Sequence, residues 1–342
     1  MNLCRKLLII YIINKMQNKI FSFDIILQPE FPSNSLVLIQ EALRITNQYR
    51  IDEIFKSKLI SINKKKVRSS NGQWWKVDGG LEDIHNPDFI IVIGGNLPVQ
   101  IKSKKLFSIL RTAHKNLSKI IAVDTGAFLI AESGLINKET VVCTHWETKS
   151  NFIDRYPHVR IVDNIYTINP NGLMFAAGGV STLDLILECV KKIKGKNYSD
   201  EIAQALIYKP RENSTLQKED HFNTSMDNLC QKSILIMEKN IETPIKINEI
   251  AKKLNVSLRT LERKFYKLYK MSPIKYYVNL RVKFARNLLF YDDRKINEIS
   301  SIAGFNYNSV FINSFKKMYN KTPSEYRKHF RNQQLDETIT DN

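Results

Sequence analysis

Residues 120–134, IIAVDTGAFLIAESG, have the pattern of a strand that turns sharply into a helix. Enzymes use such a bend to expose a nucleophile at the start of the helix. The residue at the bend is Asp124, and the cysteines lie elsewhere, at Cys4, Cys143, Cys189 and Cys230. A carboxylate acts as a nucleophile in some chemistries, but it cannot replace a thiolate in amide hydrolysis. The sequence therefore predicts no catalytic residue here. It predicts instead that the pocket above the bend binds a ligand without catalysis.

Other polar residues are expected at the same edge as Asp124. Gly94 and Gly95 close an apolar strand and permit close approach of the backbone, and Thr144-His145-Trp146 ends another strand. Ligands of open α/β sheets gather at the carboxyl ends of strands. The predicted ligand site is therefore made by Asp124, Thr125, Gly95, His145 and Trp146. Two alternatives stay open: Asp124 could simply cap its own helix, and His145 and Trp146 could be core or surface residues.

The first half of the chain supplies elements that can position these residues. Strand patterns occur at 20–27, 55–62, 88–95, 120–123, 140–146, 159–169 and 173–179, and helix patterns at 35–49, 104–115, 127–132 and 181–193. Strands buried on both faces that alternate with helices predict a doubly wound α/β domain.

Composition shifts divide the rest of the chain. The α/β domain is predicted over 16–196, a polar linker over 197–224, a helical domain over 225–331 and a tail over 332–342. Residues 1–15 are not expected to belong to the fold, and either Met1 or Met16 could be the start. The apolar core of that segment, Leu7 to Ile13, is too short to span a bilayer, so no membrane partner is expected.

The charge is concentrated in the helical third. The net charge is +18, and Met226 to Arg331 hold 22 basic and 9 acidic residues, a balance of +13. Such a region favours a polyanion, here double-stranded DNA, as partner, although Lys is frequent throughout the chain. The scattered cysteines show no zinc-ligand or disulfide spacing. No metal or cofactor is predicted, and reduced thiols favour the cytoplasm.

The helical third repeats itself. INEI occurs at 247–250 and 296–299, and Ser272-Pro273 is echoed by Thr322-Pro323. Each repeat holds a short helix, a tight turn and a longer helix, which is the helix-turn-helix plan. The apolar stripes are Leu258, Leu261, Phe265 and Leu268, then Phe311, Phe315 and Met318. The outer faces carry Arg259, Arg263, Lys267 and Lys270, then Ser309, Asn313, Lys316, Lys317 and Asn320. Ser257, and either Asn308 or Ser309, are the expected N-caps.

Residues 230–330 resemble the DNA-binding domain of AraC/XylS-type transcriptional regulators. The resemblance rests on INEIAKKLNVSLRTLERKF, SPIKYYVNLRVKFARNLL and INEISSIAGFNYNSVFINSFKKMYNKTPSEYR. It implies two helix-turn-helix units joined by a helix at about Pro273–Phe290, with both recognition helices in successive major grooves. Base contacts are implied for Arg259, Arg263, Ser309 and Asn313, and DNA contacts for Lys267, Lys316 and Lys317. Asn313 stands where the family often has Arg. Because Arg favours guanine and Asn favours adenine, the preferred base at this position is expected to be adenine.

Residues 20–195 resemble the class I glutamine-amidotransferase-like, PfpI-type superfamily, which has a flavodoxin-like fold. The matching stretches are EALRITN, IIVIGG, DTGAFLIAESGLI, THWE and AAGGVSTLDLIL. Its enzymes have Cys where this chain has Asp124, and often His where it has Thr125. Together the two domains resemble GlxA-type regulators. That resemblance implies a transcriptional activator that contacts RNA polymerase, a small-molecule effector and a homodimer, and repression stays open as the alternative to activation.

GlxA-type regulators with an Asp-Thr-Gly bend resemble those that sense arginine, glycine betaine or carnitine. Asp124 offers a negative charge to a cationic nitrogen, Trp146 a ring face, and Thr125 or the bend N–H groups a partner for a carboxylate. Two alternatives remain: an amidase or protease of the same fold, and a DNA-binding protein whose front domain only dimerises.

Overall fold

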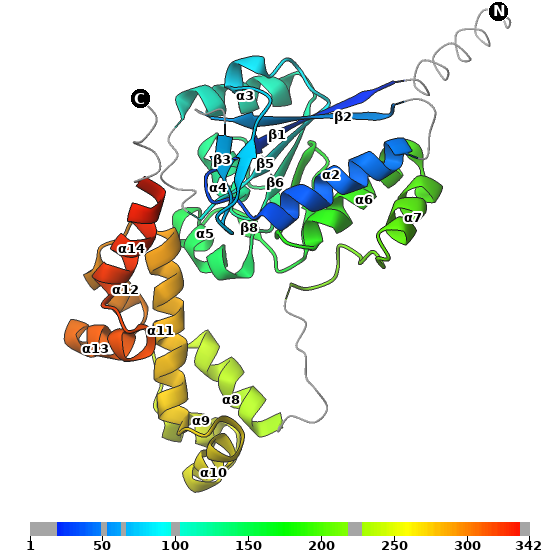
Figure 1. The fold of residues 1–342 in the computed structure, drawn as a ribbon. Helices are drawn as coiled ribbons and strands as arrows, with labels where there is room; N and C mark the ends of the chain where they lie inside the picture. The colour runs from blue at the N-terminus through cyan, green and yellow to red at the C-terminus, as the bar shows by residue number, and fades with distance from the viewer. Residues whose placement is uncertain (1–18, 49–52, 63–65, 97–102, 218–227, 336–342) are drawn as a thin grey trace, which may run out of the picture. The chain divides into compact units, whose positions relative to one another are not determined.

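The computed structural model describes residues 19–48, 53–62, 66–96, 103–217 and 228–335 (Figure 1). It separates into two compact units, Met1–Gln217 and Lys218–Asn342, each described by itself. The predictions for residues 1–15, for Met16 and for most of the tail fall outside the described residues. No described helix is both long and apolar enough to cross a bilayer.

The front unit is built on a six-stranded sheet in the order β2-β1-β5-β6-β10-β9. The first five strands run parallel, and the edge strand β9 pairs antiparallel with β10. The strands are β1 Phe21–Leu27, β2 Phe55–Ser61, β5 Phe89–Ile93, β6 Lys119–Val123, β9 Tyr166–Ile168 and β10 Leu173–Ala176. The doubly wound, flavodoxin-like prediction is confirmed.

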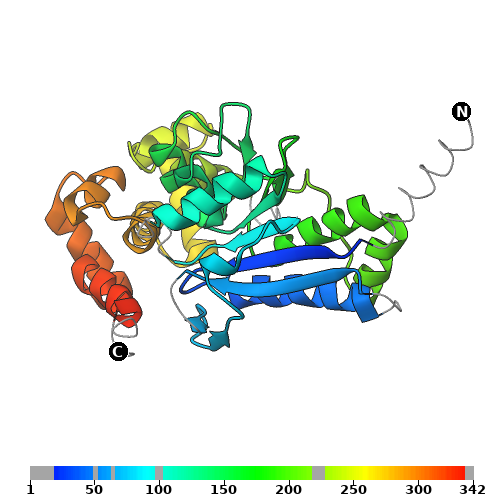
Figure 2. The ribbon, with the colours of Figure 1, turned by 90° about the horizontal axis from the view of Figure 1, so that it is seen from above.

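Helices cover both faces of this sheet, and Figure 2 shows the strands between them. One core joins the sheet to α2 (Ser33–Gln48), α6 (Ser181–Lys194) and α7 (Lys196–Ala205). The other core joins it to α3 (Lys104–Lys115), α4 (Gly126–Glu132) and α5 (Lys149–Arg155). Strands such as β5 are buried throughout because side chains on both faces meet a helical layer. A hairpin of β3 (Lys66–Arg68) and β4 (Trp74–Lys76), and a 3-10 turn η1 (Leu81–Asp83), lie outside the main sheet.

Two predicted strands differ from the structure. The stretch 140–146 forms only β7 (Val141–Val142), and 159–169 is divided between β8 (Arg160–Ile161) and β9. β7 and β8 pair in a small sheet of their own. The side chain of Asn169 bonds both the N–H and the C=O of Val141, at 2.8 and 3.0 Å, and so takes the place of a neighbouring strand. Thr144 and His145 lie in the loop after β7, and Trp146 begins a 3-10 turn, so none of the three is at a strand end.

The segment predicted as a linker, 197–224, begins with a short helix. Most of 197–205 is helix α7, whose Ile202 and Ala203 join the core. Residues 206–217 then stay with the front unit, which ends at Gln217. Polar composition concealed this attachment, because hydrogen bonds and an ion pair make it in place of apolar periodicity.

The described residues of the second unit, 228–335, form helices and no strand, with two helix-turn-helix pairs, as predicted. Its helices are α8 Asn228–Lys239, α9 Ile247–Lys253, α10 Leu258–Tyr269, α11 Pro273–Tyr291, α12 Ile296–Ile302, α13 Asn308–Tyr319 and α14 Pro323–Leu335. Two separate cores form, one around Leu261 and Phe265 and one around Phe311 and Phe315. The long helix α11 supplies Tyr277 to the first core and Leu288 to the second, so it holds both pairs.

Candidate effector site and nucleic-acid interface

The bend at Asp124 has the geometry of a nucleophile elbow. Asp124 has φ 58°, a left-handed conformation that is uncommon outside glycine and costs energy. Its N–H donates to the carbonyl of Ala176 at 2.9 Å, which ties the bend to β10. A Cβ at Gly178 would lie 2.6 Å from a carboxylate oxygen of Asp124. The backbone at 178 therefore packs directly against that carboxylate, which leaves room only for glycine.

Thr125 and Gly95 brace the bend from the other side. The Thr125 hydroxyl donates to the Gly95 carbonyl at 2.6 Å, and the Gly95 N–H donates to Oε1 of Gln28 at 2.7 Å. Thr125 is buried, and its hydroxyl proton is engaged within the fold. The sequence grouped Thr125 and Gly95 with Asp124 correctly in space, but their polar groups bond each other. The buried Nε2 of Gln28 has no partner.

The Asp124 carboxyl is electrostatically unusual. Burial raises its pKa to about 7, the N–H of Thr125 opposes that rise, and the charge of Glu147 adds to it. Helix α4 begins at Gly126 with Thr125 at the N-cap position and no side-chain cap. Asp124 is therefore not the N-cap of α4, and its charge faces a second carboxylate.

The loop after β7 places three more polar side chains near the bend. The Thr144 hydroxyl donates to the Asp124 carbonyl at 3.0 Å. The ring of His145 accepts the Glu147 N–H at 3.4 Å and so caps the turn η3 (Trp146–Thr148). His145 and Trp146 are neighbours, with ring centroids 5.6 Å apart, and Trp146 is 40% exposed. Neither is a core residue. Glu147 was missed because a lone Glu in a predicted strand end gives no signal.

This arrangement suits binding better than acyl transfer. Asp124 and Glu147 interact electrostatically, and the exposed ring of Trp146 lies next to Glu147 in the turn η3. The nearby thiol of Cys143 is buried, donates to the Phe175 carbonyl at 3.3 Å, and has a pKa raised to about 12 by that burial. A thiol that holds its proton cannot serve as a nucleophile at neutral pH. Among the described residues, no group of three or more His, Cys, Asp or Glu could hold a metal ion.

The second unit exposes the predicted DNA-contacting side chains. They are Arg259, Arg263 and Lys267 on α10, and Ser309, Asn313, Lys316 and Lys317 on α13. Two members of the predicted apolar stripe are exposed as well, Leu258 at 36% and Leu268 at 38%. The reason is that only Leu261 and Phe265 face the small core of this pair. Tyr307 and Val310, also exposed, add apolar surface to the start of α13 that the sequence analysis missed.

One expected cap is correct and one is wrong. The Ser257 hydroxyl accepts the Thr260 N–H at 3.1 Å. Neither Asn308 nor Ser309 caps α13, which has Tyr307 at its N-cap position and no side-chain cap. Asn308 instead donates to the side chain of Asn297 on α12, at 3.0 Å, and so links the two helices of the pair.

Arg281 on α11 holds the turn between α12 and α13. The sequence does not predict this role, because Arg281 is one of several basic residues on its helix. Its guanidinium donates to the carbonyls of Ala303 and Gly304, at 2.9 and 2.6 Å, and lies 4.0 Å from the ring centroid of Phe305. Gly304 has φ 74°, so the turn uses a conformation that suits glycine. The start of α13 is thereby positioned relative to α11.

Comparisons with known proteins agree with both halves. Residues 36–192 match the DJ-1/PfpI family, and residues 250–329 match the helix-turn-helix domain family. The chain thus combines a DJ-1/PfpI-type domain with an AraC-type helix-turn-helix domain, and the relatives it matches are named HTH-type transcriptional regulators, GlxA of Rhizobium meliloti among them.

Individual relatives span most of the chain. The HTH-type transcriptional regulator CdhR of Pseudomonas aeruginosa is 28% identical over 309 residues, 89% of this chain and 91% of the relative. GbdR of the same species is 27% identical over 313 residues, 90% of this chain and 84% of the relative. A crystal structure of an AraC family transcriptional regulator from Pseudomonas putida has a TM-score of 0.50 and 21% identity, covering 54% of this chain and 99% of that one. That likeness supports the fold alone.

Proposed function

We propose that this protein regulates transcription by binding a specific duplex DNA site through α10 and α13, under the control of a small nitrogen compound bound at Asp124. The observation that carries the first part is the paired helix-turn-helix units with exposed, basic and amide-bearing outer faces. Arg259 and Arg263 suit guanine, and Asn313 suits adenine. The four lysines of the two outer faces, Lys267, Lys270, Lys316 and Lys317, suit phosphates.

The effector that fits the front site is a small cation or zwitterion. Asp124 and Glu147 are two carboxylates whose repulsion a bound cation would relieve. The Trp146 face adds a cation–π contact, and His145 lies beside it. The unpartnered Nε2 of Gln28, next to Gly95, is the better candidate for an effector carboxylate, since the Thr125 hydroxyl is engaged. Betaine, carnitine and amino acids such as arginine have this chemistry.

The remaining partners follow from this role and are part of the same proposal. A homodimer would present two pairs of recognition helices, and an activator would touch RNA polymerase from the bound site. A regulator of this kind works in the cytoplasm. Footprinting upstream of the protein's own gene and its neighbours would identify the DNA site and show whether two copies bind.

DNA binding by the full chain should depend steeply on salt. Lysine and arginine contacts to phosphate release counterions, so each contact adds about 0.9 to the slope of log affinity against log salt. With the four lysines as such contacts, affinity should fall by about a hundredfold between about 50 and 200 mM salt. Fluorescence anisotropy on labelled duplexes measures this. A slope near zero would contradict recognition through the basic faces.

No amide, ester or peptide hydrolysis is expected from the purified protein, because the elbow carries a carboxylate in place of a thiolate. Chromogenic esters, p-nitroanilides and labelled casein provide the measurement, with Asp124→Asn as the matched variant. Turnover by the wild type that disappears in Asp124→Asn would establish the competing reading, an active amidase or protease.

A front unit that only dimerises is the other alternative, and thermal shift separates it from a sensor. A compound at a hundred times its Kd stabilises the folded state by about 2.7 kcal/mol. A panel of betaine, carnitine, arginine and simple amino acids should include at least one that raises the melting temperature, by an amount that grows with its concentration.

A further inference from the structure

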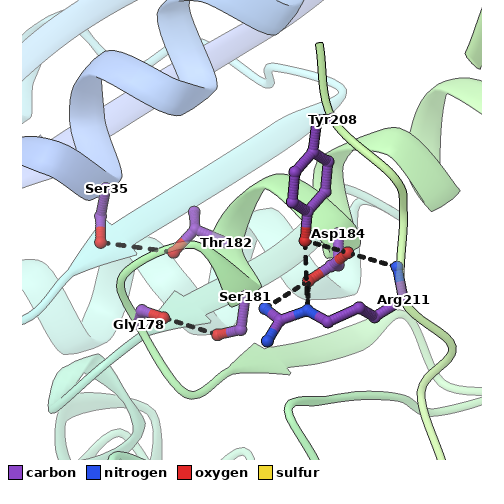
Figure 3. Close-up of polar contacts among 7 residues, drawn as sticks. All are labelled: Ser35, Gly178, Ser181, Thr182, Asp184, Tyr208 and Arg211. Carbon is purple, nitrogen blue, oxygen red and sulfur yellow. Dashed lines mark hydrogen bonds and ion pairs between the residues drawn. The ribbon is translucent and has the colours of Figure 1, made fainter. Parts of the chain in front are cut away.

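Residues 208–217, called here the strap, are the last described residues of the front unit and are fastened to it at two places. At its first end, Figure 3 shows the side chain of Asp184 on α6 surrounded by Tyr208 and Arg211. The Arg211 guanidinium donates to Oδ2 of Asp184 at 2.8 and 3.1 Å. The backbone N–H of Arg211 and the Tyr208 hydroxyl each donate to Oδ1 at 2.8 Å. The Asp184 side chain is fully buried, so this attachment is strong.

The other end of the strap pairs with the segment before β9. The N–H of Ile165 donates to the Thr215 carbonyl at 2.9 Å, and the Asn164 side chain donates to the Asn213 carbonyl at 2.6 Å. The N–H of Gln217 donates to the Asp163 carbonyl at 2.9 Å. Gln217 is thus held where the chain leaves the front unit for the helical unit.

From Gln217 a short path of hydrogen bonds leads to the elbow. Its Nε2 donates to the Thr144 carbonyl at 2.9 Å and to the Asn164 carbonyl at 3.1 Å. The Thr144 hydroxyl then donates to the Asp124 carbonyl at 3.0 Å. The three residues that follow Thr144 are His145, Trp146 and Glu147, so the strap is attached to the loop that carries the proposed effector contacts.

The contact of Gln217 is incomplete. Both of its amide hydrogen bonds are donated, and its Oε1 is buried without a partner. A buried acceptor that lacks a partner costs free energy, which its exposure to water would recover. The strap is therefore held at this end by a contact that is cheaper to release than the Asp184 cluster.

The first end is also connected to the elbow, through the start of α6. Gly178, whose backbone lies against the Asp124 carboxylate, accepts a hydrogen bond from Ser181 (Figure 3). The Gly179 N–H donates to the Ser35 hydroxyl at 3.1 Å, and Thr182 contacts the same hydroxyl at 3.3 Å. Asp184 follows in the same helix, so both strap attachments rest on elements that touch Asp124.

We propose that the strap transmits the effect of the effector to the DNA-binding unit. A cation bound at Asp124 and Glu147 shifts the loop 144–148 and so changes the hydrogen bonds between that loop and Gln217. The residue at which the chain leaves the front unit toward the DNA-binding unit then changes. This inference rests on the proposed function for its effector. Release of the strap from Gln217 back toward Arg211 adds residues 212–217 to the segment that joins the two units. The effector would then alter DNA binding through the length of that segment.

Hydrogen exchange in the full chain tests the strap without any effector. Gln217→Ala should raise the exchange rate of the Ile165 amide and of residues 212–217 by about tenfold, the change expected on losing one net hydrogen bond. Thr144→Val leaves the carbonyl that Gln217 uses and removes the contacts of the hydroxyl with the Asp124 carbonyl and with Thr148, and it should raise the same rates. Gln204→Ala, a matched change on the exposed face of α7, should not. Unchanged rates in Gln217→Ala or in Thr144→Val would overturn the strap or its link to the elbow, respectively.

DNA affinity with and without glycine betaine, carnitine or arginine tests the output. Coupling between two sites is typically about 5- to 150-fold in affinity. Gln217→Ala and Thr144→Val should abolish this change while calorimetry shows effector affinity within about threefold of wild type. Variants that bind the effector and retain the full change would refute the proposal. A wild type that binds none of these compounds counts against the proposed effector, and the exchange result then decides on the strap by itself.

Discussion

Arg263→Ala should weaken binding of the full chain to its specific DNA site by about 1–3 kcal/mol, a loss of about 5- to 150-fold, and should relax the preference at one base pair. The physical reason is that an arginine in the middle of a recognition helix donates two hydrogen bonds to one guanine, which no other base accepts in that geometry. Arg263 is exposed on α10 and lies one turn after Arg259. Binding to random duplex should change little in comparison, because random sites lack that guanine contact.

Lys317→Ala is the comparison that distinguishes base recognition from electrostatic binding to the phosphates. Lys317 lies in the last turn of α13, where a point charge toward phosphate suits its position. Its loss should weaken specific and random duplexes alike and reduce the salt slope by about one contact. An equal loss on both duplexes for Arg263→Ala would remove Arg263 from the base-reading set. Asn313→Arg should shift the preference at its base from adenine toward guanine.

Asp124→Asn should reduce affinity for a cationic effector by about 1.5–3 kcal/mol, the usual worth of a hydrogen bond to a charged group. Asparagine keeps the shape of the side chain and tolerates the left-handed backbone at 124, so the fold should survive. Calorimetry with whichever compound shifts the melting temperature measures the loss. Glu139→Gln, an exposed carboxylate-to-amide change in the same unit, is the control and should bind normally.

The pH dependence of this affinity follows from the raised pKa of Asp124, about 7. A cation prefers the ionised carboxyl, so wild-type affinity should increase from about pH 6 to about pH 8 and then level off. Asp124→Asn should lose this increase. A pH profile that is the same in wild type and variant would place the effector elsewhere.

Stability should respond in the opposite direction. Between about pH 4 and about pH 7 the folded, ligand-free protein keeps a proton on Asp124 that the unfolded chain has lost. The stability that this group contributes is therefore present at low pH and is lost as the pH rises toward 7. Asp124→Asn removes the buried charge, so it should melt higher than wild type at about pH 8, with a smaller difference at about pH 5. A variant less stable than wild type at both pH values would contradict this assignment of burial.

The order of the main elements was predictable because their signals are local. Apolar runs such as Ile90 to Ile93 and the stripe of Phe311 and Phe315 point to buried strands and helix faces without reference to the rest of the chain. The elements that were misjudged depend on distant partners. Asn169 bonds Val141 at the start of β7, and Arg211 attaches the strap through Asp184, and neither contact leaves a periodic pattern.

The candidate site was likewise predictable only where its residues are close together in the sequence. The bend at Asp124 and its glycine neighbours follow a pattern within a few residues, and the structure brings Thr125 and Gly95 to it. Which of these residues has a polar group left for a ligand was not predictable, because that depends on the hydrogen bonds made within the fold. Gln28 and Glu147 come from other parts of the chain, and only the fold shows that they face the bend.

The cysteines have a consequence for the conditions in which such a regulator can work. Cys143, Cys189 and Cys230 are buried, and burial raises the pKa of Cys143 and of Cys189 to about 12. Oxidants and alkylating agents react with thiolates, and the raised pKa values keep Cys143 and Cys189 protonated at neutral pH. The bend itself carries a carboxylate in place of a thiolate. The proposed response to an effector therefore needs no thiol chemistry at the bend.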